Sequence, residues 1–237
     1  MAESVMSREN PFVDPSDGTS TYDGAPVYEP MRPGFKKYLL YYTTSRLNVT
    51  LHLGSSSNPA TYYCETQLKL KSPQLLLRRG DAKTSPMVSF ARLQTTSRHM
   101  LLGKGDYNAL SKDEIAWEEL HREKNALKCS DYTFSTKVGG GAGGTAAFRW
   151  RKDTSKTWST VYDCVDERER VVARLFSGGM FNFKKGGEVD VVVEGLSQDL
   201  EECLLMSSLA IWSFEALDYH SILQGYESGN QSKDKQT

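Results

Sequence analysis

Residues 203–214 of this 237-residue chain read CLLMSSLAIWSF, and apolar side chains stand at helical spacing on essentially every face. A helix lying on a sheet carries one apolar stripe, whereas a helix that is apolar all round must be enclosed. Ser197 is a suitable N-cap, and Glu201 and Glu202 put negative charge in the first turn, where the helix dipole favours it. The sequence therefore predicts an enclosed helix over about residues 198–217.

The chain before this helix consists of short β-like runs separated by turn signals. Residues 47–53 alternate cleanly, which predicts a strand with Leu47, Val49, Leu51 and Leu53 on one face. The other predicted strands cover residues 38–44, 61–71, 75–79, 88–93, 100–102, 115–120, 132–138, 146–151, 160–165, 171–176, 180–183 and 189–193.

Charge and glycine mark two of the turns between these strands. Residues 166–169 (Asp-Glu-Arg-Glu) are typical of a charged hairpin tip, and residues 184–187 (Lys-Lys-Gly-Gly) are expected to separate two further strands. Within the strand 146–151, the arginines that flank Trp150 indicate that this indole points inward.

The enclosed helix decides between the two architectures that such strands favour, a sandwich and a barrel. In a chain of this length, the economical way to bury the helix is to run it through a closed barrel. We therefore expect a mainly β domain over residues 36–226, an antiparallel barrel around a buried C-terminal helix. Residues 1–35 are rich in Ser, Asp, Gly and Pro and predict a flexible leader, and the polar residues 227–237 predict a disordered tail.

Composition limits the class of protein. The formal net charge of −1 gives no overall attraction to nucleic acid. The four cysteines stand far apart without a C-x-x-C pair, which argues against a zinc site and a dense disulfide framework. The first residues lack the apolar core of a signal peptide, and residues 203–214 fall well short of the roughly 20 that span a bilayer. We expect a cytoplasmic protein with reduced thiols, with peripheral contact to membranes as an option.

Several landmarks together resemble a known superfamily. They are Trp117-Glu-Glu-Leu120, Phe148-Arg-Trp-Arg151, the hairpin Cys164 to Arg174 and the closing apolar helix. Over residues 36–226 the chain looks like the fungal branch of the tubby C-terminal-like superfamily, which also contains LURP-one-related and phospholipid-scramblase proteins. The resemblance implies a closed barrel of about twelve strands around a central helix. Tubby proteins bind phosphoinositide head groups through clustered Lys and Arg, although the scramblase Cys-rich stretch is missing here.

Basic residues supply the candidate binding groups. Residues two apart on a strand share a face, and paired cations on one face can hold a phosphate or a lipid head group. If these residues instead lie among acids such as Glu65, Glu118 and Glu119, the interaction with a protein partner is the better interpretation. The candidates are Lys69, Lys71, Arg78, Arg79, Arg149 and Arg151.

Motifs for catalysis or cofactor binding are not evident. Residues 139–144 match G-x-G-x-x-G, but a strand follows them rather than the helix that holds a phosphate, which indicates a hairpin loop. The histidines show no metal-ligand spacing, and no G-x-S-x-G elbow occurs; they are His52, His99, His121 and His220. We therefore expect no catalytic, metal or cofactor site, and a non-enzymatic binding module for anionic lipid. The alternatives are a protein-interaction or regulatory protein without lipid binding and, least favoured, a hydrolase.

Overall fold

The computed structural model describes residues 35–45, 47–69, 72–94, 99–124, 130–138, 144–155, 160–177 and 184–216. The predicted tail and all but the last residue of the predicted leader lie outside them. The described residues form twelve strands and one helix: β1 (Lys36–Tyr42), β2 (Val49–Leu53), β3 (Ala60–Thr66), β4 (Leu75–Arg79), β5 (Met87–Leu93), β6 (Met100–Lys104), β7 (Glu118–Lys124), β8 (Ser130–Lys137), β9 (Thr145–Lys152), β10 (Thr160–Asp166), β11 (Val171–Ser177), β12 (Lys185–Val191) and α1 (Gln198–Ala216).

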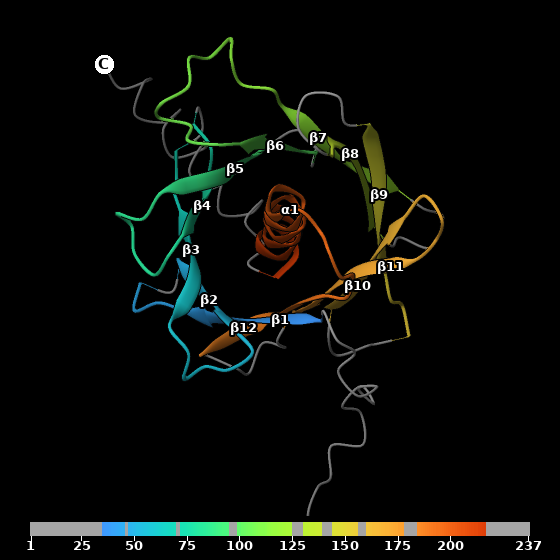
Figure 1. The fold of residues 1–237 in the computed structure, drawn as a ribbon, viewed down its shortest axis with the longest axis horizontal. Coiled ribbons are helices and arrows are strands. Elements are labelled where there is room, and N and C mark those ends of the chain that lie inside the picture. Colours follow the sequence, from blue (N-terminus) through green and yellow to red (C-terminus); the bar gives the residue numbers. More distant parts are fainter. Residues whose placement is uncertain are drawn as a thin grey trace, which may run out of the picture. The chain divides into compact units, whose positions relative to one another are not determined.

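The strands close into one antiparallel barrel. Each strand pairs with the next along the chain, and β1 pairs with β12 to complete the ring. Closure leaves no unpaired edge between the first and last strands. The helix α1 runs through the middle of this ring (Figure 1). The predicted fold class, a mainly β barrel around a C-terminal helix, is therefore confirmed.

Alternation along the strands sorts side chains between the helix and the outside. In β2, Val49 and Leu51 are buried in the core, as their period-2 spacing predicts. Leu47 and Leu53, predicted on the same face, lie before the strand and at its last residue and are 38% and 37% exposed. Burial of one face is thus limited to the length of strand that faces the helix.

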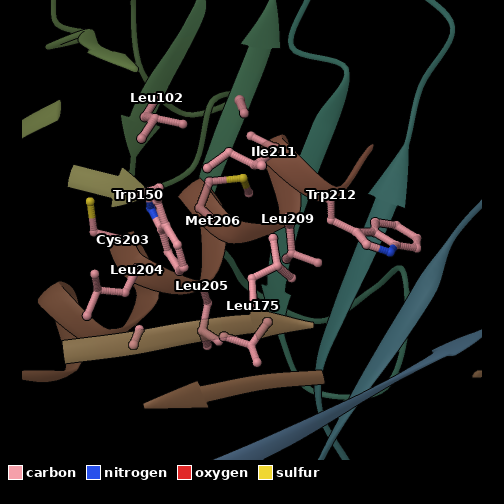
Figure 2. Packing of buried hydrophobic residues seen from close by; sticks show 14 of the residues in the cluster. Leu102, Trp150, Leu175, Cys203, Leu204, Leu205, Met206, Leu209, Ile211 and Trp212 are labelled. Atoms are coloured by element: carbon pink, nitrogen blue, oxygen red, sulfur yellow. The ribbon is translucent and has the colours of Figure 1, made fainter. Parts of the chain in front are cut away.

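The helix is buried from Leu200 to Phe214, and its start follows the predicted cap. Ser197 Oγ accepts the N–H of Leu200 (3.3 Å), and the Ser197 carbonyl accepts the N–H of Glu201 (3.0 Å). Every residue from 200 to 214 is buried. Figure 2 shows Trp150 of β9 and Leu175 of β11 among the side chains that pack around α1. In the part of the chain that the structure describes, no helix is long and apolar enough to cross a membrane.

Two indole hydrogen bonds fix the helix against the wall. Trp150 points inward, as predicted, and its Nε1–H donates to Ser207 Oγ (3.0 Å), while that hydroxyl donates to the carbonyl of Leu204 (2.9 Å). Trp212 of the helix donates from Nε1 to the carbonyl of Gly186 in β12 (2.9 Å). Both buried indoles are therefore satisfied, as apolar surroundings require.

The expected turn at residues 184–187 is wrong, because β12 begins at Lys185. Gly187 pairs with Leu40 on one side and Ser177 on the other. A Cβ at Gly186 would stand 2.8 Å from Trp212 Cζ2, and a Cβ at Gly187 would stand 2.3 Å from a backbone carbonyl oxygen. The glycines allow close approach inside the sheet rather than a reversal of the chain. The strand predicted at 180–183 lies outside the described residues.

The strands β3 and β7 also depart from their predicted bounds. The strand β3 ends at Thr66, although the alternation suggested that it continues to residue 71. The strand β7 begins at Glu118 rather than at Ile115. The aromatic ring of Trp117 instead packs edge-on against Phe90 (5.2 Å between centroids), a buried residue on the outer side of β5. Residues 107–117 therefore supply apolar side chains to a small second core outside the barrel wall.

Leu209, on the buried face of α1, supplies a test of the enclosed helix. Leu209→Asp places an unpaired charge among apolar side chains, so we expect a loss of more than about 4 kcal/mol and no cooperative melt by circular dichroism. Leu53→Asp, at the half-exposed end of β2, should cost about 1 kcal/mol or less. A Leu209→Asp melt that matches the wild type would refute the enclosed helix.

The carboxyl group of Asp190 is buried on the outer side of the barrel. Asp190 of β12 stands opposite Lys37 of β1 and Arg174 of β11. Its side chain is buried, and its Oδ1 has no hydrogen-bond partner among the described residues. Burial raises the pKa of Asp190 to about 6, against the opposing pull of Lys37, and Glu188 adds to the rise. The charged form of Asp190 is therefore unfavourable in the folded protein.

This raised pKa predicts a particular pH dependence of stability. The contribution of Asp190 is fully present below the ordinary Asp pKa and is lost as the pH rises through about 6. Urea unfolding from about pH 4 to about pH 8 should show the wild type losing up to about 3 kcal/mol relative to Asp190→Asn. A constant difference between the two proteins across this range would contradict the assignment.

Candidate functional site

A hollow of about 600 Å³ opens beside strands β7 to β10. It is lined by an apolar and aromatic set together with carboxylates of the β10–β11 hairpin. The lining residues are Trp117, Glu118, Glu119, His121, Thr133, Phe134, Ser135, Ala147, Phe148, Arg149, Val165, Asp166, Glu167 and Glu169. We call this hollow the β7–β10 groove.

The strand register places three polar side chains of the groove in a row. His121 of β7 stands opposite Thr133 of β8, which stands opposite Arg149 of β9. Each alternates with a buried neighbour, such as Leu120 beside His121 and Trp150 beside Arg149, so the row faces away from the helix. Strand pairing thus brings together groups that are 28 positions apart in the sequence.

The carboxylates of the β10–β11 hairpin have partners of two kinds. Asp166 pairs with Arg170 (2.6 Å) and Glu169 pairs with Arg151 (2.7 Å). Glu167 Oε1 accepts the backbone N–H of Ala147 (3.0 Å), a neutral donor that leaves its charge uncompensated. The predicted hairpin tip at residues 166–169 is confirmed, since β10 ends at Asp166 and β11 begins at Val171.

Arg149 is the one predicted site residue that faces the groove as an exposed cation. Its guanidinium makes no hydrogen bond or ion pair with any other residue that the structure describes. Arg151, two residues further on β9, shares its face but pairs with Glu169. The structure therefore places Arg149 and Arg151 on one side of the sheet, as predicted. Of the two, only the Arg149 guanidinium is available to a ligand, because Arg151 is paired with Glu169.

The other basic candidates do not join this pair. Arg78 lies outside the barrel with Glu65 (3.3 Å), and Arg79 binds Glu202 of the helix (2.7 Å). Lys69 is exposed and lies beyond the end of β3, and Lys71 is outside the described residues. The described basic candidates are thus dispersed over the barrel. Three of them, Arg78, Arg79 and Arg151, form ion pairs with glutamates.

Arg79 belongs to a polar cluster at the N-terminal end of α1. The buried Glu202 accepts from both Arg79 and the Tyr62 hydroxyl (3.3 Å), and the buried Glu201 pairs with a lysine of β1 and the hydroxyl of Tyr38. Burial, with the neighbouring carboxylates, raises the pKa of both tyrosines. These contacts neutralise two acids at the barrel mouth, and they give Arg79 a structural role.

The buried cysteines behave as small apolar groups. Cys64, Cys164 and Cys203 are free thiols inside the barrel. Burial, with a nearby carboxylate in each case, raises the pKa of Cys64 and of Cys203 to about 12. A thiol in that state supplies little thiolate, which is the reactive form.

His99, Glu119 and His121 form a cluster that sequence spacing did not reveal. One nitrogen from each ring and one Glu119 oxygen lie within 4.8 Å of one another. The two imidazoles are stacked, with centroids 4.2 Å apart and planes at 14°. His99 meets the pair only through the β6–β7 pairing, so no linear motif could place it. The spacing Glu119-x-His121 on one strand was the available signal.

Comparisons of the chain with models of protein families, with curated proteins and with solved structures gave no match. The resemblance to the tubby C-terminal-like superfamily therefore stays a prediction.

Proposed function

We propose that the chain is a non-enzymatic binding module that takes a basic protein segment in the β7–β10 groove. The mixed charge of this groove, with an excess of carboxylates beside the apolar residues Trp117, Ala147 and Val165, is the observation that carries the proposal. Complementary charge of this kind selects partners and speeds their encounter. A segment that carries Lys or Arg beside apolar side chains fits such a surface.

The charges within the groove indicate which charge a preferred partner carries. Among the residues that the structure describes, Glu167 is bound only by a backbone N–H and Glu119 lies near two imidazoles, so neither carboxylate has a Lys or Arg side chain paired with it. Arg149 supplies the one positive charge of an arginine or lysine among the lining residues of the groove. Two uncompensated carboxylates against one guanidinium favour a cationic ligand at low salt.

Dispersal of the basic candidates among acids supports the protein partner over a membrane. A phosphate held by Arg149 and Arg151 would meet the carboxylates of Glu167 and Glu169 on the neighbouring hairpin. The negative charges of the phosphate and of these carboxylates would repel each other and oppose binding. Anionic lipid is the second candidate function, and the open guanidinium of Arg149 is the observation that favours it. A cytoplasmic location and membership of the tubby-like superfamily are part of this second proposal.

The test titrates the full chain with two labelled peptides, one in which Lys alternates with Leu and one in which Glu replaces Lys. Fluorescence anisotropy should show binding of the Lys peptide only. Glu167→Gln keeps the acceptor for Ala147 but removes the charge, so affinity should fall about two- to fivefold. Arg149→Gln should raise affinity by a similar factor, because it removes the repelling cation.

Asp81→Asn is the matched control, since it removes an exposed carboxyl from the β4–β5 turn, outside the groove. Its affinity for the Lys peptide should equal that of the wild type. Phosphatidylcholine vesicles with and without a phosphoinositide complete the experiment. Binding of the phosphoinositide vesicles that Arg149→Gln abolishes, without binding of the Lys peptide, would replace the protein-segment proposal by the lipid one.

A further inference from the structure

Two histidines from different strands face each other on the outside of the barrel. The β6–β7 register pairs Met100 with Leu120, so the residue before the first and the residue after the second, His99 and His121, stand opposite each other. Their rings are in stacking contact. Glu119 precedes His121 by two positions on β7 and therefore shares its face. Directly opposed and diagonal side chains of this kind lie within reach of one another.

The three side chains offer the donor set of a transition-metal site. Imidazole nitrogens and carboxylate oxygens bind Zn²⁺, Co²⁺ and Ni²⁺, at about 2.0–2.2 Å for zinc. In a tetrahedral site, neighbouring donors are then about 3.3–3.6 Å apart. The carboxylate oxygen of Glu119 is already 3.6 Å from Nδ1 of His121 and 3.9 Å from Nδ1 of His99. Small rotations of the side chains therefore suffice to bring the donors around one ion.

Exposure gives the side chains this freedom. Glu119 and His121 are each 53% exposed, and His99 is 24% exposed. Parallel rings send their lone pairs in parallel planes, so at least one imidazole must tilt to share an ion. His99 Nδ1 also accepts the backbone N–H of Arg122 (3.0 Å), and His99 must give up that hydrogen bond as it turns. One backbone hydrogen bond is thus exchanged for coordination of the metal.

We propose that His99, Glu119 and His121 bind one divalent transition-metal ion of the zinc class. Three protein donors leave at least one coordination position for water or for an atom of a partner. His121 and Glu119 also line the β7–β10 groove, so the open position lies at the edge of that groove. The site stands on its own donors and does not depend on the function proposed for the groove.

Calorimetric titration of the full chain with ZnCl₂ tests the site, and no peptide is present. We expect one ion per chain, with His121→Gln and His99→Gln each weakening the affinity at least about tenfold. His52→Gln is the matched control and should bind as the wild type does. His52 lies on β2, where its ring nitrogens contact Thr50 Oγ1 and the carbonyl of Asn58, away from the cluster.

Two further measurements make the outcome decisive. Circular dichroism melts establish that each variant is folded, and His121→Gln is the safer variant, because the hydrogen bond to Arg122 is made by His99. The Co²⁺-loaded chain should show ligand-field bands without a sulfur-to-metal charge-transfer band. Absence of zinc binding, unchanged affinity in both folded cluster variants, or a thiolate charge-transfer band would each overturn the proposal.

Discussion

The enclosure of α1 is the constraint on which the rest of the structure depends. A helix that is buried at every residue from 200 to 214 cannot be covered by an open sheet, which reaches one side only. The wall must close, and the β1–β12 pairing closes it. Close contact then forces small residues where the helix meets the wall, as Gly186 shows beside Trp212. The two indoles that enter this interior have hydrogen-bond partners, Ser207 for Trp150 and the carbonyl of Gly186 for Trp212.

A filled interior moves recognition to the outside and the ends of the barrel. Barrels of small lumen can hold a ligand inside, but here the inner side chains pack against α1 (Figure 2). At the N-terminal end of α1, Arg79 forms an ion pair with Glu202. This arginine, a candidate binding residue in the sequence, therefore stabilises the fold instead. On the outer face of β6 to β10, Arg149, Glu119 and Glu167 have no oppositely charged Lys, Arg, Asp or Glu paired with them among the described residues.

Local periodicity predicted most of the fold, because burial acts residue by residue. The all-round apolar pattern of residues 203–214 required an enclosure, and Val49 and Leu51 alternate inward as expected. Gly186 and Gly187 were misread as a turn, since a sequence does not say whether glycine serves a reversal or a close approach. The His99–His121 contact could not be predicted, because it needs the register of two strands, which packing sets.

The two sites proposed on this wall share Glu119, and this sharing couples them. A divalent ion held by His99, Glu119 and His121 would cancel the Glu119 carboxylate and add positive charge at the edge of the β7–β10 groove. The groove would then hold Glu167 against Arg149 and the metal, which favours an acidic segment over a basic one. Because binding linkage is reciprocal, a basic segment in the groove must weaken the metal by the same factor. On these two proposals, the charge of the Glu119 side chain would set which partner the β7–β10 groove prefers.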